Sequence, residues 1–121
     1  MSGEGQRRVL ALVADLMDRS RLNAAAAEST TVICKAPTAP AASTVDLEGV
    51  DLVIVDLARP TALAAIEALR PRTTARIVAY GPHVDRERLA AAEAAGSDDV
   101  LARSAFVARL GGLLGDPAQP R

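Results

Sequence analysis

The stretch at residues 51–60 (DLVIVDLARP) limits the fold more than any other part of this chain. Four apolar residues, three of them β-branched, lead to the carboxylate of Asp56 and then to a turn at Arg59 and Pro60. A short apolar run that ends in a turn is typical of a strand buried on both faces of a parallel sheet. Open parallel sheets bind ligands beyond the carboxyl ends of their strands. Asp56 is therefore predicted to lie where such a protein carries its chemistry.

Four more apolar runs recur along the chain, and segments with helical signals separate them. The predicted strands are residues 9–13, 30–35, 51–56, 75–80 and 99–102. The predicted helices are residues 16–27, 61–70 and 86–95, with a last helix that starts after Ser104. Residues 36–40 are expected to break structure, and residues 41–49 read either as a short helix or as an irregular crossover.

Strands that alternate with helices over short connections indicate βαβ units with right-handed crossovers. The predicted fold class is therefore α/β. It is a (βα)5 doubly wound, three-layer sandwich around a parallel five-stranded sheet of strand order 2-1-3-4-5. Asp15, Asp85 and Ser104 stand where each can cap the helix that follows it, and Gly96 stands at a helix end.

Length and composition indicate one domain. A chain of 121 residues that is 50% hydrophobic can bury one core without a disulfide or metal staple. Residues 1–6 are expected to be a disordered lead-in, residues 7–114 the folded domain, and residues 115–121 a flexible tail.

Charge and cysteine content exclude several classes of function. A net charge of −1 supplies no field to attract nucleic acid or a membrane surface. No apolar run approaches the ~18 residues of a membrane-spanning helix, and the first residues lack the apolar core of a signal peptide. We expect a cytoplasmic protein. The single cysteine, Cys34, reads as a small buried hydrophobe, with a redox or nucleophilic role as the alternative. Arg86 and Arg88 read as a solvated helix face.

Several motifs carry a resemblance to a known family. Pro60 follows Asp56 by four residues, a Gly-Ser-Asp-Asp run occupies residues 96–99, and an Arg-Ser-Ala-Phe run occupies residues 103–106. Over about residues 7–114 the chain resembles the response-regulator receiver domain, the CheY-like phosphoacceptor module of two-component signalling. The resemblance implies a flavodoxin-like fold and a phosphoacceptor position at Asp56.

The chain also departs from that family at positions that carry chemistry. Receivers place two acidic residues after the first strand to hold Mg²⁺, and here the pair is Ala14 and Asp15. Gly81 stands at the Ser or Thr, Arg103 at the Lys, and Val100 at the aromatic residue of the fifth strand. The resemblance therefore implies an atypical receiver, or pseudo-receiver, with Mg²⁺ on Asp15 and Asp56 as the implied metal site.

The strand ends place a set of polar side chains at one rim of the sheet. The set is Asp15, Asp18, Asp56, His83, Arg103 and Ser104. Three interpretations stay open. In the first, Arg103 forms a salt bridge to Asp56 or Asp15 that locks the site. In the second, the rim holds a metal or an anion, with Asp18 as a third carboxylate. In the third, Asp56 accepts a phosphoryl group. His83 is either a solvated or capping residue or a proton-responsive, phosphate-contacting group.

The function expected from these residues is that of a stand-alone, atypical receiver-like adaptor. It would act through contacts with an unknown protein partner and without standard Asp phosphorylation. The face built by residues 86–95, residues 99–102 and the last helix reads either as plain packing on the sheet or as a homodimer surface. The alternative is a small module or minor enzyme that binds an anion, a metal or a nucleotide at the rim. The chain has no Gly-rich phosphate loop and no nucleophile paired with a base, so catalysis is not favoured.

Overall fold

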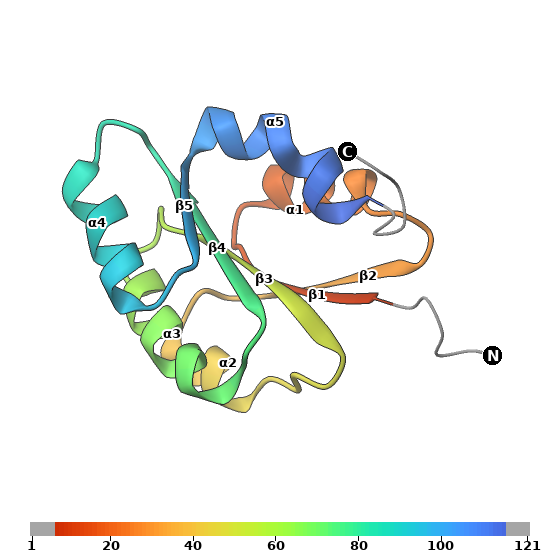
Figure 1. Cartoon of the computed structure of the whole chain (residues 1–121), viewed down its shortest axis with the longest axis horizontal. Helices are drawn as coiled ribbons and strands as arrows, with labels where there is room; N and C mark the ends of the chain where they lie inside the picture. Colours follow the sequence, from red (N-terminus) through yellow and green to blue (C-terminus); the bar gives the residue numbers. More distant parts are fainter. Residues whose placement is uncertain (1–6, 116–121) are drawn as a thin grey trace.

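A parallel sheet forms the centre of the molecule (Figure 1). The computed structural model describes residues 7–115, and within that range the sheet has five strands. They are β1 (Arg7–Leu12), β2 (Thr30–Lys35), β3 (Val50–Asp56), β4 (Arg76–Gly81) and β5 (Asp99–Ala102). The strand order is β2-β1-β3-β4-β5, and every neighbouring pair is parallel. The predicted fold class and strand order are confirmed.

The helices cover the two faces of the sheet (Figure 1). They are α1 (Leu16–Ala25), α2 (Ala39–Thr44), α3 (Ala62–Leu69), α4 (Arg86–Ala95) and α5 (Arg103–Leu114), with a 3₁₀ turn η1 (Arg70–Arg72) after α3. Helices α1 and α5 pack on one face, and helices α2, α3 and α4 pack on the other. No helix among residues 7–115 is both long and apolar enough to cross a membrane.

The sheet is buried on both faces, as the apolar runs indicated. In β3, Val53 and Val55 pack toward α2, α3 and α4, and Leu52 and Ile54 pack toward α1 and α5. Successive side chains of a strand point to opposite faces, so a strand between two helical layers must be apolar throughout. Residues 52–56 of β3 are all buried, and Asp56 is the only charged residue among them.

The structure corrects the boundaries of several elements. The strands at residues 30–35 and 99–102 match the prediction, whereas the other strands shift by one or two residues and α1 ends at Ala25. The predicted break at residues 36–40 is confirmed only for residues 36–38, because α2 begins at Ala39. Pro40 lies in the first helical turn, where proline costs no hydrogen bond, and the Thr38 side chain accepts a hydrogen bond from the Ala41 N–H at 3.2 Å.

Two of the three predicted helix caps are confirmed. Asp15 Oδ1 accepts from the Asp18 N–H at 3.0 Å, and Asp85 Oδ1 accepts from the Arg88 N–H at 3.2 Å. The cap predicted at Ser104 is wrong. β5 runs directly into α5, so Ala102 occupies the N-cap position and Ser104 lies inside the first turn. Among the side chains of residues 7–115, none caps this helix.

Gly96 ends α4 as predicted, and the structure shows why a glycine stands there. Its φ is +126°, which side-chain-bearing residues rarely adopt. A Cβ atom at this position would also lie 2.8 Å from the aliphatic stem of Arg70. The Arg70 guanidinium donates to the carbonyl oxygens of Gly96, Thr73 and Ala75, so it joins the loops at the amino edge of the sheet. The predicted lead-in at residues 1–6 and the tail beyond residue 115 lie outside the described residues.

Candidate functional site at the carboxyl edge of the sheet

Asp56 is the last residue of β3, and its side chain is buried at the carboxyl edge of the sheet. The residue is 4% exposed, and this burial raises the pKa of its carboxyl group. Its Oδ1 accepts a hydrogen bond from the Ala58 N–H at 2.9 Å, which stabilises the charged form in part. The bond also ties the carboxylate to the loop between β3 and α3, so its orientation is set locally.

The most heavily bonded acidic group of the rim is Asp18, in the first turn of α1. Asp18 is 3% exposed. Arg103, the first residue of α5, approaches it with both terminal nitrogens, one of them 2.8 Å from Oδ2 and the other in contact with Oδ1. The Tyr80 hydroxyl donates to Oδ2 at 2.9 Å. A carboxylate held by a guanidinium fork and a phenol is fixed in both position and charge.

These contacts determine the protonation states around Asp18. Burial acts to raise the pKa of Asp18, but the hydrogen bonds from Arg103 and Tyr80 outweigh it and hold the pKa below its ordinary value. Burial, together with the nearby carboxylates of Asp56 and Asp18, raises the pKa of Tyr80 well above its usual range. Tyr80 is therefore a neutral donor, Arg103 a cation and Asp18 an anion at neutral pH.

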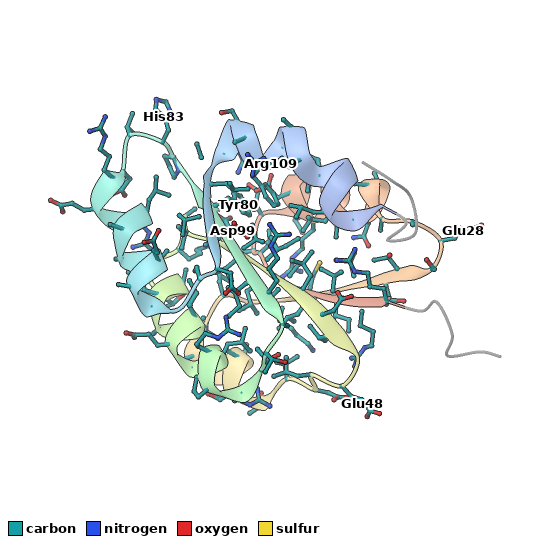
Figure 2. All side chains as sticks on the ribbon, viewed as in Figure 1. Glu28, Glu48, Tyr80, His83, Asp99 and Arg109 are labelled. Atoms are coloured by element: carbon teal, nitrogen blue, oxygen red, sulfur yellow. The ribbon has the colours of Figure 1, made fainter. Side chains whose placement is uncertain are left out.

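An aromatic pair in the core holds one member of the polar cluster in place. The rings of Tyr80 on β4 and Phe106 on α5 stack with centroids 3.9 Å apart and an interplanar angle of 1°. The Arg103 guanidinium carbon lies 5.9 Å from the centroid of the Tyr80 ring, within the range of a cation–π contact. Figure 2 shows Tyr80 in the interior below α5. The stack sets the position of the hydroxyl that reaches Asp18.

The predicted rim residues do gather at this edge, although they do not all touch. Asp15 is exposed at the start of α1, and Ser104 is exposed at the start of α5. His83 is also exposed (Figure 2). His83, Arg103 and Ser104 line one open groove of about 600 Å³ together with Pro82 and Val107. The charges of Asp18, Arg103 and Asp15 act on Asp56 through space, with no hydrogen bond to it.

The predicted salt-bridge partner of Arg103 is wrong. The sequence interpretation paired Arg103 with Asp56 or Asp15, and the structure pairs it with Asp18. Helices α1 and α5 lie side by side on one face of the sheet. The first turn of α1 therefore points Asp18 at the beginning of α5, while Asp15 is occupied as the cap of α1. An ion pair does form at the rim, but Asp56 is not part of it.

The donor set does not fit a metal site built from three protein carboxylates. The receiver resemblance implies Mg²⁺, which prefers carboxylate oxygens and retains waters. Both oxygens of Asp18 are engaged by Arg103, and Asp15 is exposed and caps α1. Within residues 7–115, no group of three His, Cys, Asp or Glu side chains could hold a metal ion. Mg²⁺ on Asp15 and Asp56 stays a prediction.

Two further residues shape the edge around Asp56. A Cβ atom on Gly81 would lie 3.2 Å from the Leu57 Cβ, so a hydroxyl-bearing side chain at this position would be crowded. The Arg88 guanidinium, from α4, donates to the carbonyl oxygens of Leu57 and Arg59 in the loop that follows Asp56. Arg88 is thus a connection between α4 and this loop, and its assignment to a solvated helix face is wrong.

Sequence reasoning missed Tyr80 and Arg88 as parts of the site. Tyr80 carried a signal, because the chain has one tyrosine and one phenylalanine, and the structure places both in the same core cluster. Arg88 carried no signal in the sequence, since its partners are backbone carbonyl oxygens. Cys34 is half-buried on β2, and burial raises the pKa of its thiol, which favours the unreactive form.

Comparison with known proteins identifies the fold. No protein-family model and no curated protein sequence matches the chain. Among solved structures, a response regulator from Hahella chejuensis is similar with a TM-score of 0.73 and 21% identity, over 90% of this chain and 92% of that one. The receiver domain of the TMAO respiratory system response regulator TorR is similar with a TM-score of 0.68 and 22% identity, over 89% of this chain and 96% of that one. An orphan response regulator of H. pylori is similar with a TM-score of 0.66 and 20% identity, over 91% of this chain and 98% of that one. The chain has the flavodoxin-like fold of response-regulator receiver domains.

Proposed function

We propose that this chain is a receiver-like signalling domain of the cytoplasm that acts through protein–protein contacts, without standard phosphorylation of Asp56. The observation that carries the proposal is the ion pair between Arg103 and Asp18. In the family that the chain resembles, the residue at the Arg103 position is a lysine that pairs with the phosphoryl group. Here the cation at that position is already paired with a buried carboxylate.

The charges around Asp56 argue against a stable acyl phosphate. A phosphoryl group adds about −1.5 to −2 charges and needs cations and fixed donors around its oxygens. Arg103 is neutralised by Asp18, and Gly81 supplies no hydroxyl where a receiver has one. The Ala58 N–H is the donor that contacts Asp56. The described rim therefore offers little to balance the added charge.

Exposed apolar side chains at the same edge support a role in protein contacts. Leu16 and Met17 in the first turn of α1 are 78% and 69% exposed, and Val84 in the loop before α4 is 76% exposed. Val107 on α5 is 39% exposed and lines the groove beside Arg103. Apolar side chains grouped around a functional edge are a usual sign of a partner surface. The face of α4, β5 and α5 stays a proposed homodimer surface.

The phosphorylation test is a mass measurement. The protein is incubated with Mg²⁺ and acetyl phosphate, and its intact mass is compared with that of Asp56→Asn under the same conditions. We expect no phosphate-sized gain in the wild-type protein. A gain that is lost in Asp56→Asn would overturn the proposal. Arg103→Lys is the informative companion, because a gain that appears only in this variant identifies Arg103 as the group that prevents phosphorylation.

One observation favours a second candidate, a small anion-binding module. The open groove beside Arg103 holds two further polar side chains, His83 and Ser104. A thermal-shift series with inorganic phosphate, nucleotides and Mg²⁺ tests it. A shift that Ser104→Ala and His83→Ala abolish would favour the anion-binding module over the adaptor. The absence of any shift would leave the adaptor.

A further inference from the structure

We propose that two copies of this chain associate through their β2 strands, which pair antiparallel around a two-fold axis at Val32 and join the two sheets into one. The argument rests on the open edge of the sheet, the direction of its backbone groups and the symmetry of its side chains. It does not depend on the function proposed above.

The two edges of the sheet are protected to different degrees. The strand order leaves β2 at one edge and β5 at the other. β5 has four residues, and at its start Asp99 forms a salt bridge with Arg76 at 2.6 Å. β2 has six residues, and no charged residue occurs between Thr30 and Cys34. Short strands and charges are the usual protection of a sheet edge against pairing, and β2 lacks both in its central part.

The backbone of β2 presents free hydrogen-bonding groups away from the sheet. The carbonyl oxygens of Ser29 and Lys35 accept from the N–H groups of Arg7 and Val13, at 2.7 and 3.2 Å. Backbone groups of a strand alternate in direction along the chain. Those of the residues at positions 31 and 33 therefore also face β1, and those of Val32 and Cys34 face outward.

An antiparallel pair centred on Val32 is self-complementary. Val32 of one copy lies opposite Val32 of the second copy. The outward Thr30 carbonyl meets the Cys34 N–H, whereas the Thr30 N–H already donates to the Ala27 carbonyl at 2.9 Å. Opposed β-branched side chains are favourable cross-strand pairs. In the same register Thr31 of one copy lies diagonally opposite Lys35 of the other on the same face of the joined sheet, and symmetry forms this contact twice. Both side chains are exposed in the single chain.

The surface beside β2 leaves room for a second copy. Helix α2 has only six residues, and Ala42 is its one buried residue. Ile33 and Lys35 line an open groove of about 400 Å³ between β2 and α2. The side chains of Val32, Ile33 and Cys34 are each only partly buried. A second β2 strand would cover these three apolar side chains, which supplies a hydrophobic contribution to the pairing.

The first test compares two substitutions at Val32 by sedimentation equilibrium over a micromolar-to-millimolar concentration series. We expect wild-type protein to approach twice the 12.5 kDa of one chain. Val32→Pro removes an outward N–H and no bond to β1, so it should give a monomer. Val32→Ala removes more of the side chain than Val32→Pro does but keeps the N–H, so it should still dimerise. A monomeric wild-type protein, or a dimer that Val32→Pro leaves intact, overturns the proposal.

A second variant keeps the test decisive if Val32→Pro does not fold. Thr31→Lys changes an exposed side chain and places new positive charges near Lys35 across the pair, so the folded variant should dimerise more weakly. The amide protons of Val32 and Cys34 in the wild-type protein should exchange more slowly at high protein concentration. Exchange that is independent of concentration at both amides contradicts the proposed pairing.

Charge reversal tests the register. Thr31→Lys should weaken the dimer several-fold, and the double variant Thr31→Lys with Lys35→Glu should restore it, because the two diagonal contacts then pair opposite charges. Failure of the double variant to recover overturns the register. Ala90→Glu and Ala94→Glu on α4 are matched controls at the other proposed homodimer face, and they should leave the dimer unchanged. A dimer lost in these variants and kept in Val32→Pro would assign the interface to α4, β5 and α5 instead.

Discussion

Asp18 keeps its negative charge although it is buried, because the side chains that donate hydrogen bonds to it stabilise the ionised form. Two guanidinium nitrogens and one phenol surround it, and the phenol is held in place by its stack on Phe106. At Asp56 the balance is different, since one backbone N–H does not offset burial and the pKa is raised. Two aspartates of the same edge thus have opposite pKa shifts, and the difference lies in their partners.

Replacing Arg103 with alanine should destabilise the fold. Asp18 would keep the Tyr80 hydroxyl and the more distant guanidinium of Arg21, 3.9 Å away, and a buried carboxylate that loses its closest cation costs free energy. Because the Arg103 side chain is 44% exposed, water can enter, and we expect a loss of about 1–3 kcal/mol in the free energy of unfolding. Urea denaturation measures it.

Arg109 provides the matched control for this prediction. It is exposed on the same helix, and the ion pairs found within residues 7–115 do not include it. Arg109→Ala should change stability by no more than about 0.5 kcal/mol. Equal effects of the two substitutions would mean that the Arg103–Asp18 pair adds nothing to the fold.

At the scale of elements, the junction between β5 and α5 explains both the reach of Arg103 and a weakness of the helix. β5 ends at Ala102 and α5 begins at Arg103, with no loop between them. Arg103 therefore lies directly at the strand end, and its side chain extends along the rim toward α1. The same junction leaves Ala102 at the N-cap position, where it offers no acceptor to the free N–H groups of the first turn. The backbone there is extended, which suits a capping residue.

Ala102→Ser should therefore stabilise the protein. A serine at this position can accept from the first-turn N–H groups, and we expect a gain of about 0.5–1 kcal/mol in thermal or urea unfolding. Ser104→Ala is the comparison, because Ser104 lies within the helix and should be close to neutral. A loss of about 1 kcal/mol in Ser104→Ala would show instead that Ser104 is the cap.

At the scale of the whole molecule, aspartates with opposite pKa shifts should give the free energy of unfolding a maximum in weakly acidic solution. The pKa of Asp18 is lowered against burial by Arg103 and Tyr80, and the pKa of Asp98 is lowered chiefly by the Ile77 N–H, 2.8 Å away. Below the ordinary range of an aspartate, the unfolded chain binds these protons more readily, so stability falls. Asp98 is half-exposed and contributes less.

Asp56 accounts for the rise in the free energy of unfolding between neutral pH and this maximum. Its folded pKa is raised, so the folded protein takes up this proton first, and stability rises as the pH falls from neutral through that pKa. Urea midpoints measured from neutral to strongly acidic pH should rise and then fall. Asp56→Asn should remove the rise and keep the fall. A rise that persists in Asp56→Asn would assign it to another group.

The sequence by itself determined the fold class, the strand order and the edge of the sheet at which the candidate site lies. Those features follow from apolar runs such as residues 52–55, from caps such as Asp15 and from the handedness of βαβ units, all of which act over short stretches of chain. It also placed Asp18, Asp56 and Arg103 at one rim, because parallel strands end at the same edge.

Only the tertiary structure determined which of these side chains meet. Arg103 pairs with Asp18 because α1 and α5 lie on the same face of the sheet, and Tyr80 reaches the pair because Phe106 supports its ring. Arg88 contacts carbonyl oxygens, which any residue carries, so no pattern of residue types could indicate it. Contacts of this kind depend on ångström-scale packing between elements distant in the chain, whereas the elements themselves depend on local periodicity.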